Sequence, residues 1–175
     1  MPPSVHGVDF RLAKEPARRE NAGVEKILVP VDFSDASGRL IAVAEETARA
    51  RGASLHLLHV IEPVATTAGL ETDPAMAQLQ VAQDLDAEER IESERLRKLA
   101  AEISARGLAS TSAVKFGLPA DEIISSAKDL GAGLVVMGSH GHGALYHLFT
   151  GSVVTGLLRR IDCPVLVVPL RQKKA

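Results

Sequence analysis

Glycines spaced along one short stretch, with a serine at its end, give this sequence its clearest capacity for chemistry, which is the binding of an anion. The stretch runs from Gly138 through Gly141 to Gly151 and Ser152. Because glycine has no side chain, the backbone N–H groups around it can approach a phosphate closely. A helix that begins at residues 151–154 would aim its free amides and the positive end of its dipole at the same anion, and the Ser152 hydroxyl would add a donor. The stretch therefore predicts a phosphate-binding loop.

Asp32 is the second residue whose position suggests chemistry, because it directly follows the apolar run Ile27–Val31. In an open α/β sheet, ligands bind beyond the carboxyl ends of the strands, where the strand order reverses. Asp32 would lie at that edge, as would the glycine stretch, which follows an apolar run ending at Met137. A carboxylate repels phosphates unless a divalent ion intervenes, so we expect Asp32 to accept a hydrogen bond from a ribose or an adenine amino group. The two features together predict a nucleotide lying across the crevice.

Each of these features also has a simpler structural interpretation. A glycine-rich loop between a strand and a helix is often only a turn. Residues 32–35 offer capping oxygens for the helix that follows them, and Asp32 alone could be only such a cap. Ser152 could likewise cap its own helix. Their shared position on one edge of one sheet favours the binding interpretation.

Apolar runs alternate with helical patterns along the chain. Most of the runs are nearly continuous, which is typical of parallel strands buried on both faces. This alternation predicts right-handed crossovers and a single doubly wound α/β domain, with helices on both faces of a parallel sheet. The predicted strands are residues 27–30, 54–61, 109–116, 134–137 and 165–168; the predicted helices are a segment through Leu40 and Ala48 closed by Gly52, residues 88–106, residues 119–130 and a short helix after the glycine stretch.

The segment from Pro63 to about Asp84 is rich in Ala, Thr, Gln and Asp, and it predicts no regular element. A connection of this length is a lid, a partner-binding element or a partly helical excursion. It carries enough apolar side chains to contact a partner or a second copy of the chain. They are Leu70, Met76, Leu79, Val81 and Leu85.

The 175-residue length suits one domain. We expect residues 1–23 to be a flexible extension, residues 24–171 to form the domain and residues 172–175 to be a basic tail. A net charge of −2 argues against binding to nucleic acid, and no apolar run is long enough to span a membrane. Cys163 is the only cysteine, which fits a reducing compartment, and residues 1–23 lack the apolar segment of a secretory signal. We therefore expect a cytoplasmic protein.

Neither a catalytic set nor a metal site made of side chains is expected. His56 and His59 are three residues apart on one strand, so their side chains point to opposite faces. The histidines of the glycine stretch have no acidic residue or cysteine at usable spacing. The sequence also lacks a P-loop, a zinc-protease helix motif and a nucleophile elbow. Fast hydrolysis of a nucleotide is therefore not expected.

At the level of whole motifs, the chain resembles the universal stress protein family, in its ATP-binding branch. That branch has the pattern G-x2-G-x9-G-[ST], which Gly138, Gly141 and Gly151-Ser152 satisfy without a gap. The opening residues 26–34 are similar to the family's first strand and its aspartate, and residues 58–61 and 162–168 are similar to its second and last strands. The resemblance covers about residues 25–170.

The resemblance implies a five-stranded parallel sheet of order 3-2-1-4-5, dimers, and bound ATP with Mg²⁺ or Mn²⁺ held through its phosphates. It also assigns the residues on the adenosine side of the site. Pro30, Val31 and Asp32 would line the base and the ribose, and Val60 would offer backbone groups to the adenine edge.

On the phosphate side, the resemblance assigns two groups of residues. Met137, Gly138, His140 and Gly141 would flank the ribose and phosphates, and Gly151, Ser152, Val153 and Val154 would hold the phosphate chain. Relatives often carry a hydroxyl residue where this chain has Val154, with Thr155 one place later. Backbone amides could still serve at that position.

The family implies a regulator with slow ATPase activity or none. We expect an ATP-binding stress-response protein whose nucleotide occupancy alters a dimer surface or the surface for an unidentified protein partner. A slow ATPase or phosphotransfer enzyme, and a nucleotide-free structural dimer, are the alternatives. The terminal segment Val165–Leu170 is apolar and predicted to lie at the sheet edge, so pairing with its symmetry mate would give a homodimer.

Overall fold

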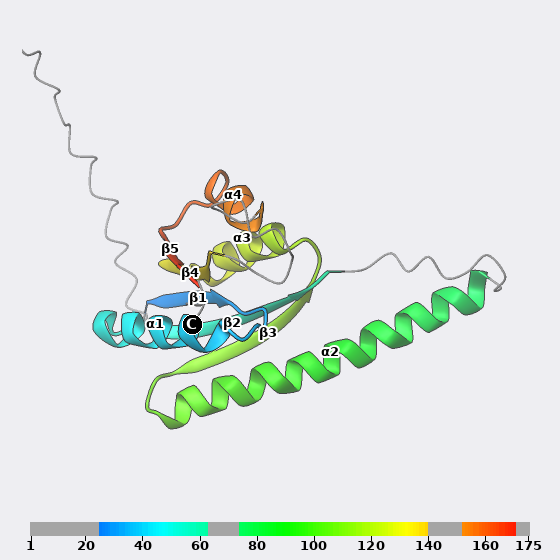
Figure 1. Cartoon of the computed structure of the whole chain (residues 1–175), viewed down its shortest axis with the longest axis horizontal. Coiled ribbons are helices and arrows are strands. Elements are labelled where there is room, and N and C mark those ends of the chain that lie inside the picture. Colours follow the sequence, from blue (N-terminus) through cyan, green and yellow to red (C-terminus); the bar gives the residue numbers. More distant parts are fainter. Residues whose placement is uncertain (1–24, 63–73, 140–151, 171–175) are drawn as a thin grey trace, which may run out of the picture.

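Residues 25–62, 74–139 and 152–170 are the part of the chain that the computed structural model describes (Figure 1). Strands and helices alternate along these residues. In chain order the elements are β1 (Lys26–Pro30), α1 (Ser37–Arg51), β2 (Ser54–Ile61), α2 (Pro74–Ala105), β3 (Ser110–Phe116), α3 (Pro119–Leu130), β4 (Leu134–Gly138), α4 (Ser152–Leu158) and β5 (Val165–Val168).

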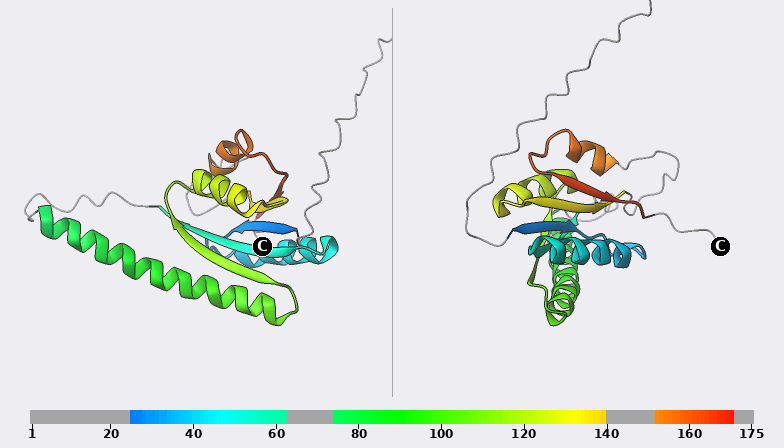
Figure 2. Two further views of the ribbon diagram at one scale, coloured as in Figure 1. Left: turned by 180° about the vertical axis from the view of Figure 1, so that it is seen from behind. Right: turned by 90° about the vertical axis from the view of Figure 1, so that its left-hand side faces the viewer.

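The five strands form one parallel sheet in the order β3-β2-β1-β4-β5. Helices α1 and α2 cover one face of this sheet, and α3 and α4 cover the other (Figure 2). Strand β1 is central, since Ile27 pairs with Leu55 of β2 on one side and with Leu134 of β4 on the other. The predicted doubly wound fold and its strand order are confirmed, and the order reverses between β1 and β4.

The core explains why the apolar runs are continuous. Ile27 and Val29 pack in the cluster beneath α1 and α2, whereas Leu28 packs with α3 and α4. All three side chains are fully buried, because helices cover both faces of β1. A β-strand exposed on one face would need to alternate polar and apolar residues, and β1 does not.

Glycines end two of the helices where the sequence predicts. Gly52 after α1 and Gly131 after α3 adopt left-handed backbone conformations, with φ of 61° and 60°. Each donates its N–H to carbonyls of the preceding turn, a closure that L-residues with a Cβ adopt at an energetic cost.

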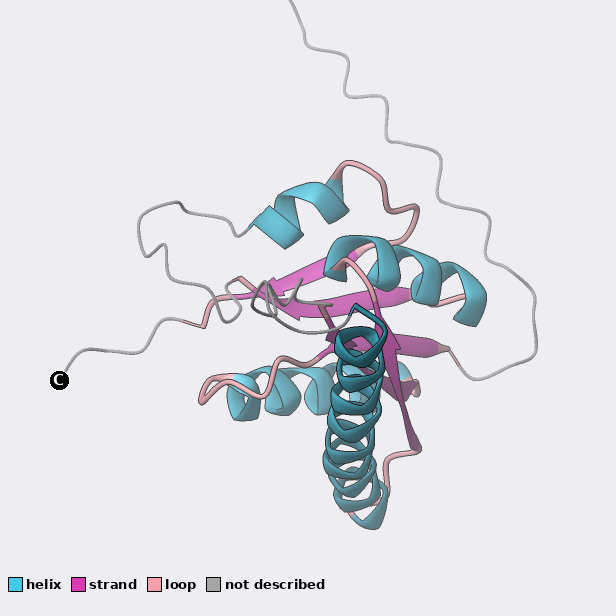
Figure 3. Cartoon of the chain, turned by 90° about the vertical axis from the view of Figure 1, so that its right-hand side faces the viewer, coloured by secondary structure: helices cyan, strands magenta, loops and turns pink. Residues whose placement is uncertain are grey.

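Helix α2 departs from the prediction at its start. It begins at Pro74, whereas the sequence pattern places the helix at residues 88–106. Residues 74–87 carry strong helix formers and open with a proline, which is favoured in the first turn, and these signals extend the helix toward its N-terminus. The C-terminal half packs on the sheet through Leu96, Ala100 and Ile103 as predicted, while the N-terminal part reaches beyond the sheet (Figure 1). Figure 3 views α2 nearly along its axis.

A helix of this length extends for about 48 Å, at the usual rise of 1.5 Å per residue. Among the described helices, α2 included, none combines the length and the apolar character needed to cross a membrane.

Candidate functional site

The carboxyl ends of β1, β2 and β4 lie side by side at one edge of the sheet, because these strands are parallel neighbours. This edge brings together the described residues that the sequence predicts for the adenosine side of the site. Val31 is buried, and Asp32 and Val60 are half-buried. At the end of β4, Met137 is 4% exposed and Gly138 is half-buried.

The backbone after β1 continues the ladder for one residue beyond Pro30. The Val31 N–H donates to the carbonyl oxygen of Leu58 at 2.8 Å. The Val31 carbonyl oxygen then accepts a 2.8 Å hydrogen bond from Nδ1 of His59. A carbonyl oxygen can only accept, so the imidazole hydrogen must lie on Nδ1. Val31 is therefore fixed to β2 through both of its backbone groups.

Asp32 is fixed by its own loop. Its Oδ1 accepts hydrogen bonds from the Ser34 N–H and from the Ser37 hydroxyl, both at 3.0 Å. The expectation that residues 32–35 cap α1 is wrong in that form, since the N-cap is Ala36 and no side chain bonds to the cap amides. Asp32 instead shapes the turn that precedes the helix, which gives its carboxylate a defined direction at the sheet edge.

Ser34 contributes a buried hydroxyl to the same turn. Its Oγ has no hydrogen-bond partner among the described residues. A buried polar atom left in this state costs about 1–3 kcal/mol. A ligand or a water that bonds to this hydroxyl would remove that cost, so the atom adds a second polar group to the edge beside Asp32.

Phe33, between these two residues, has a backbone that most residues avoid. Its φ is 55°, the one positive value among the described non-glycine residues. Side chains with a Cβ adopt this region at an energetic cost, and such residues cluster at functional loops. The ring centroids of Phe33 and His59 lie 5.0 Å apart. On the Phe33 ring, the guanidinium carbon of Arg95 lies 4.0 Å from the centroid. Sequence reasoning identified neither contact.

The end of β4 is fixed to β5. The Ser139 N–H donates to the Val168 carbonyl oxygen at 2.9 Å, and the Leu170 N–H donates to Ser139 Oγ at 3.3 Å. The glycine stretch leaves the sheet from this position. Its residues His140, Gly141 and Gly151 lie outside the described residues.

Helix α4 begins at Ser152, where the sequence predicts a helix to start. The Val153 side chain is half-buried, and that of Val154 is 2% exposed within the core beneath α3 and α4. Because the Val154 side chain faces the core, only its backbone could contact a ligand. The roles assigned to residues 151–154 remain predictions.

The edge at the ends of β1 and β4 combines polar and buried apolar groups. The Asp32 carboxylate, the buried Ser34 hydroxyl and the backbone ends of β1 and β4 lie at this edge of the sheet, while the side chains of Val31 and Met137 are buried in the core on opposite faces. Sites for small molecules often place a few oriented polar groups beside apolar surface. Within residues 25–62, 74–139 and 152–170, no three His, Cys, Asp or Glu side chains are grouped so as to hold a metal ion.

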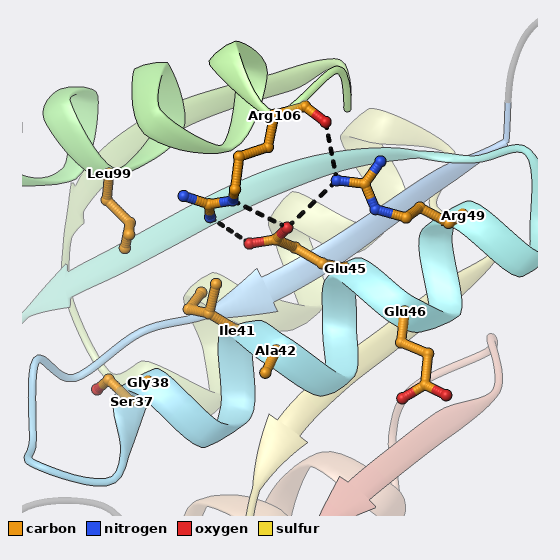
Figure 4. Close-up of a pocket in the computed structure, with 9 residues that line it drawn as sticks. All are labelled: Ser37, Gly38, Ile41, Ala42, Glu45, Glu46, Arg49, Leu99 and Arg106. Carbon is orange, nitrogen blue, oxygen red and sulfur yellow. Dashed lines mark hydrogen bonds and ion pairs between the residues drawn. The ribbon is translucent and has the colours of Figure 1, made fainter.

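A separate groove of about 670 Å³ runs along the outer side of α1, facing the end of α2 (Figure 4). Three of its four charged residues are engaged with one another. Glu45 pairs with both Arg106 and Arg49, and Arg49 also donates to the Arg106 carbonyl oxygen at 3.0 Å. The pKa of Glu45 is lowered chiefly by the hydrogen bond from Arg106, and also by the positive charge of Arg106 and by the interactions with Arg49. These contacts tie α1 to α2, so we assign the groove a structural role.

The chain matches the sequence model of the Universal stress protein family over residues 23–169. Among curated relatives, Universal stress protein YxiE of Bacillus subtilis is 33% identical over 145 residues, which cover 82% of this chain and 97% of the relative. Universal stress protein UspA from Lactobacillus plantarum has the same fold, with a TM-score of 0.69 and 26% identity over 85% of this chain and 99% of that protein.

Two further solved structures of universal stress proteins contain nucleotides. One, from Archaeoglobus fulgidus, is a complex with dAMP; it has a TM-score of 0.53 and 23% identity over 82% of this chain and 96% of that protein. The other is a complex with cAMP, with a TM-score of 0.54 and 21% identity over 85% of this chain and 98% of that protein. At these identities, the likeness to this chain is one of fold.

Proposed function

The chain belongs to the universal stress protein family, and on that basis we propose that it binds ATP across the crevice between β1 and β4. In this proposal, nucleotide occupancy alters a dimer surface or the surface for another protein, and the chain acts as a regulator in the cytoplasm. The observation that carries the proposal is the fixed Asp32 carboxylate at the point where the strand order reverses.

The adenosine half would lie against the ends of β1, β2 and β4. Asp32 would accept a hydrogen bond from the ribose or the adenine amino group, beside the backbone of Pro30 and Val31. Val60 would present backbone groups to the adenine edge, and Met137 would flank the ribose where the site continues toward the phosphates. Two family members form complexes with dAMP and cAMP, which supports an adenine nucleotide as the ligand class.

The phosphate half would extend toward the glycine stretch. Backbone amides would supply most of the donors, because glycines leave them accessible. The residues proposed for this half are Gly138, His140, Gly141, Gly151, Ser152, Val153 and Val154. Mg²⁺ or Mn²⁺ would be held through the phosphate oxygens and would offset their negative charge.

A homodimer through the outer edge of β5 is part of the proposal. In the described sheet, β5 has β4 on one side and no strand on the other. Leu166 on this strand is 37% exposed, and an uncovered apolar edge favours pairing with another strand. The edge strand follows α4 in the chain, so nucleotide bound at the start of α4 could act on the dimer contact.

A thermal-shift experiment with ATP, ADP and GTP, each with Mg²⁺, tests the binding proposal. A ligand at one hundred times its Kd adds about 2.7 kcal/mol to the free energy of unfolding, and about 2–4 °C follows from each kcal/mol in a domain of this size. We expect ATP to raise the Tm by several degrees, and Asp32→Ala to reduce that rise.

Asp35→Ala is the matched control, because Asp35 is an exposed carboxylate in the same turn. It should keep the full ATP effect. An unchanged Tm for the wild-type protein with all three nucleotides would contradict the proposal, and an undiminished rise in Asp32→Ala would contradict the role assigned to that residue.

A further inference from the structure

Three side chains from three separate segments form a continuous stack beside the Asp32 turn. Arg95 of α2 places its guanidinium carbon 4.0 Å from the Phe33 ring centroid, and Phe33 follows β1. The Phe33 ring in turn lies 5.0 Å from the imidazole of His59 on β2, at an interplanar angle of 47°. Contacts of this geometry are attractive, since the face of an aromatic ring carries partial negative charge.

The stack acts on the backbone of the Asp32 turn. His59 donates to the Val31 carbonyl oxygen, one residue before Asp32, and Phe33 follows Asp32 directly. Phe33 holds a φ of 55°, a conformation that persists where surrounding contacts compensate its cost. Asp32 is therefore flanked on both sides by residues whose conformations depend on the stack.

Glu92 lies near Arg95 on the same helix and forms an ion pair with it. Its Oε2 lies 3.8 Å from Arg95 Nη1, and its side chain is 20% exposed. The neighbouring charges of α2 are engaged elsewhere, because Arg97 and Lys98 both pair with Glu94. Among the described cations of this helix, Arg95 is the one seated on an aromatic ring.

We propose that Arg95 is a positioning residue for nucleotide binding. By stacking on Phe33 it stabilises the turn at residues 31–34 in the shape that receives the adenosine half, and so it couples α2 to the site. The proposal rests on the proposed function, because it assigns a residue of α2 to the nucleotide site described above. It also makes a specific distinction: Arg95 affects the adenosine side and not the phosphate side.

The experiment compares Arg95→Ala with Arg97→Ala. Both variants remove one arginine charge from neighbouring positions of α2, but Arg97 lies on the outer side and pairs with Glu94. Isothermal titration with AMP, ATP and inorganic tripolyphosphate separates the two halves of the site. We expect Arg95→Ala to weaken the binding of AMP and of ATP by the same factor, about two- to fivefold, as for the loss of an exposed cation–π contact. The affinity for tripolyphosphate should stay unchanged.

Two further measurements separate positioning from a general loss of stability. Arg95→Lys should recover part of the affinity, because an ammonium group also binds the face of an aromatic ring. In a Phe33→Leu background, Arg95→Ala should cause no further loss, since its partner is already absent. In ligand-free protein, the amide resonances of residues 31–34 should shift in Arg95→Ala and stay in place in Arg97→Ala.

The outcomes distinguish this inference from the function on which it rests. A wild-type protein that binds none of the adenine nucleotides contradicts the proposed function. Nucleotide binding in the wild-type protein that is unchanged in Arg95→Ala contradicts the positioning role alone. Equal losses in Arg95→Ala and Arg97→Ala would also overturn it, because they would indicate a general effect of charge.

Discussion

The Nδ1 atom of His59 lies 2.8 Å from the carbonyl oxygen of Val31, so a side chain of β2 holds the backbone at the end of β1. This contact places a histidine in the support of the candidate site, although the sequence indicates only that its side chain points to the face opposite that of His56. The carbonyl can only accept, which fixes the tautomer of the neutral ring. Its Nε2 therefore has no hydrogen while the ring is neutral.

Removing this contact should weaken nucleotide binding. In His59→Ala the Val31 carbonyl loses its side-chain donor and Phe33 loses a ring neighbour, so we expect the turn around Asp32 to loosen. A lost hydrogen bond typically lowers the free energy of unfolding by about 1 kcal/mol. Titration with AMP and chemical unfolding measure the two effects.

His56→Ala is the control for that prediction. His56 lies on the same strand, and its Nδ1 is 2.8 Å from Thr111 Oγ1, away from the end of β1. It should lose stability but keep the wild-type affinity for AMP. Equal affinity for AMP in His59→Ala and wild-type protein would show that the Val31 contact does not support the site.

His56 should make the stability depend on pH. Burial, followed by the positive charges of Lys26 and Lys115, lowers the pKa of His56 below its usual value of 6.5. As the pH falls below 6.5, the unfolded chain takes up a proton at this position while the folded chain does not. The free energy of unfolding should therefore fall as the pH drops from 6.5 toward the lowered pKa, and the contribution should be fully present above 6.5.

Urea unfolding between pH 7 and pH 5 measures this dependence. His56→Gln retains a group that can bond to Thr111 but removes the titration, so its stability should change less over the range. The carboxylates with lowered pKa, Glu25 and Glu45, titrate below their usual value of 4.5 and so outside the range. The same slope in both proteins would contradict the assignment to His56.

The contact of α2 with the sheet should depend on one face of the helix. Leu96 is fully buried, and its replacement by alanine leaves a cavity, for which we expect a loss of about 2–5 kcal/mol in the free energy of unfolding. Ile91 on the same helix is 65% exposed, so Ile91→Ala should change stability by less than about 0.5 kcal/mol. Similar losses in the two variants would contradict the described orientation of α2.

The proposed dimer contact can be tested at β5. A lysine at Leu166 would place a charge on the exposed edge strand, and we expect it to convert a micromolar dimer into a monomer in sedimentation equilibrium. Ile91→Lys adds the same charge on α2 and should leave the dimer intact. A wild-type protein that is monomeric at these concentrations, or a Leu166→Lys variant that remains dimeric, would contradict a dimer formed through β5.

Much of the fold could be predicted from the sequence because local signals agree with it. The run Ile27–Val29 is continuous since both faces of β1 are buried, and Gly52 and Gly131 end their helices through a backbone conformation that glycine favours. The start of α2 was missed, because the segment up to about Asp84 is rich in Ala, Thr, Gln and Asp, a composition from which no regular element was predicted.

The candidate site was predicted in part. Asp32 was placed at a strand end from the sequence itself, whereas Val60 and Met137 came from the family resemblance. All three lie near the carboxyl ends of parallel strands, and their contacts with a nucleotide stay predictions. The contact between Phe33 and Arg95 could not be predicted, because it joins residues distant in sequence and depends on how α2 crosses the sheet. The left-handed backbone of Phe33 has no sequence signal either, as phenylalanine rarely adopts it.

A crystal structure of the protein grown with excess ATP and Mg²⁺ tests the central claim most directly. The account predicts one nucleotide per chain, with its adenosine half beside Asp32 and the ends of β1 and β4, and its phosphates against the backbone of residues 138–154. Density for ATP elsewhere, or a crevice filled by side chains of the protein with no nucleotide present, would contradict it.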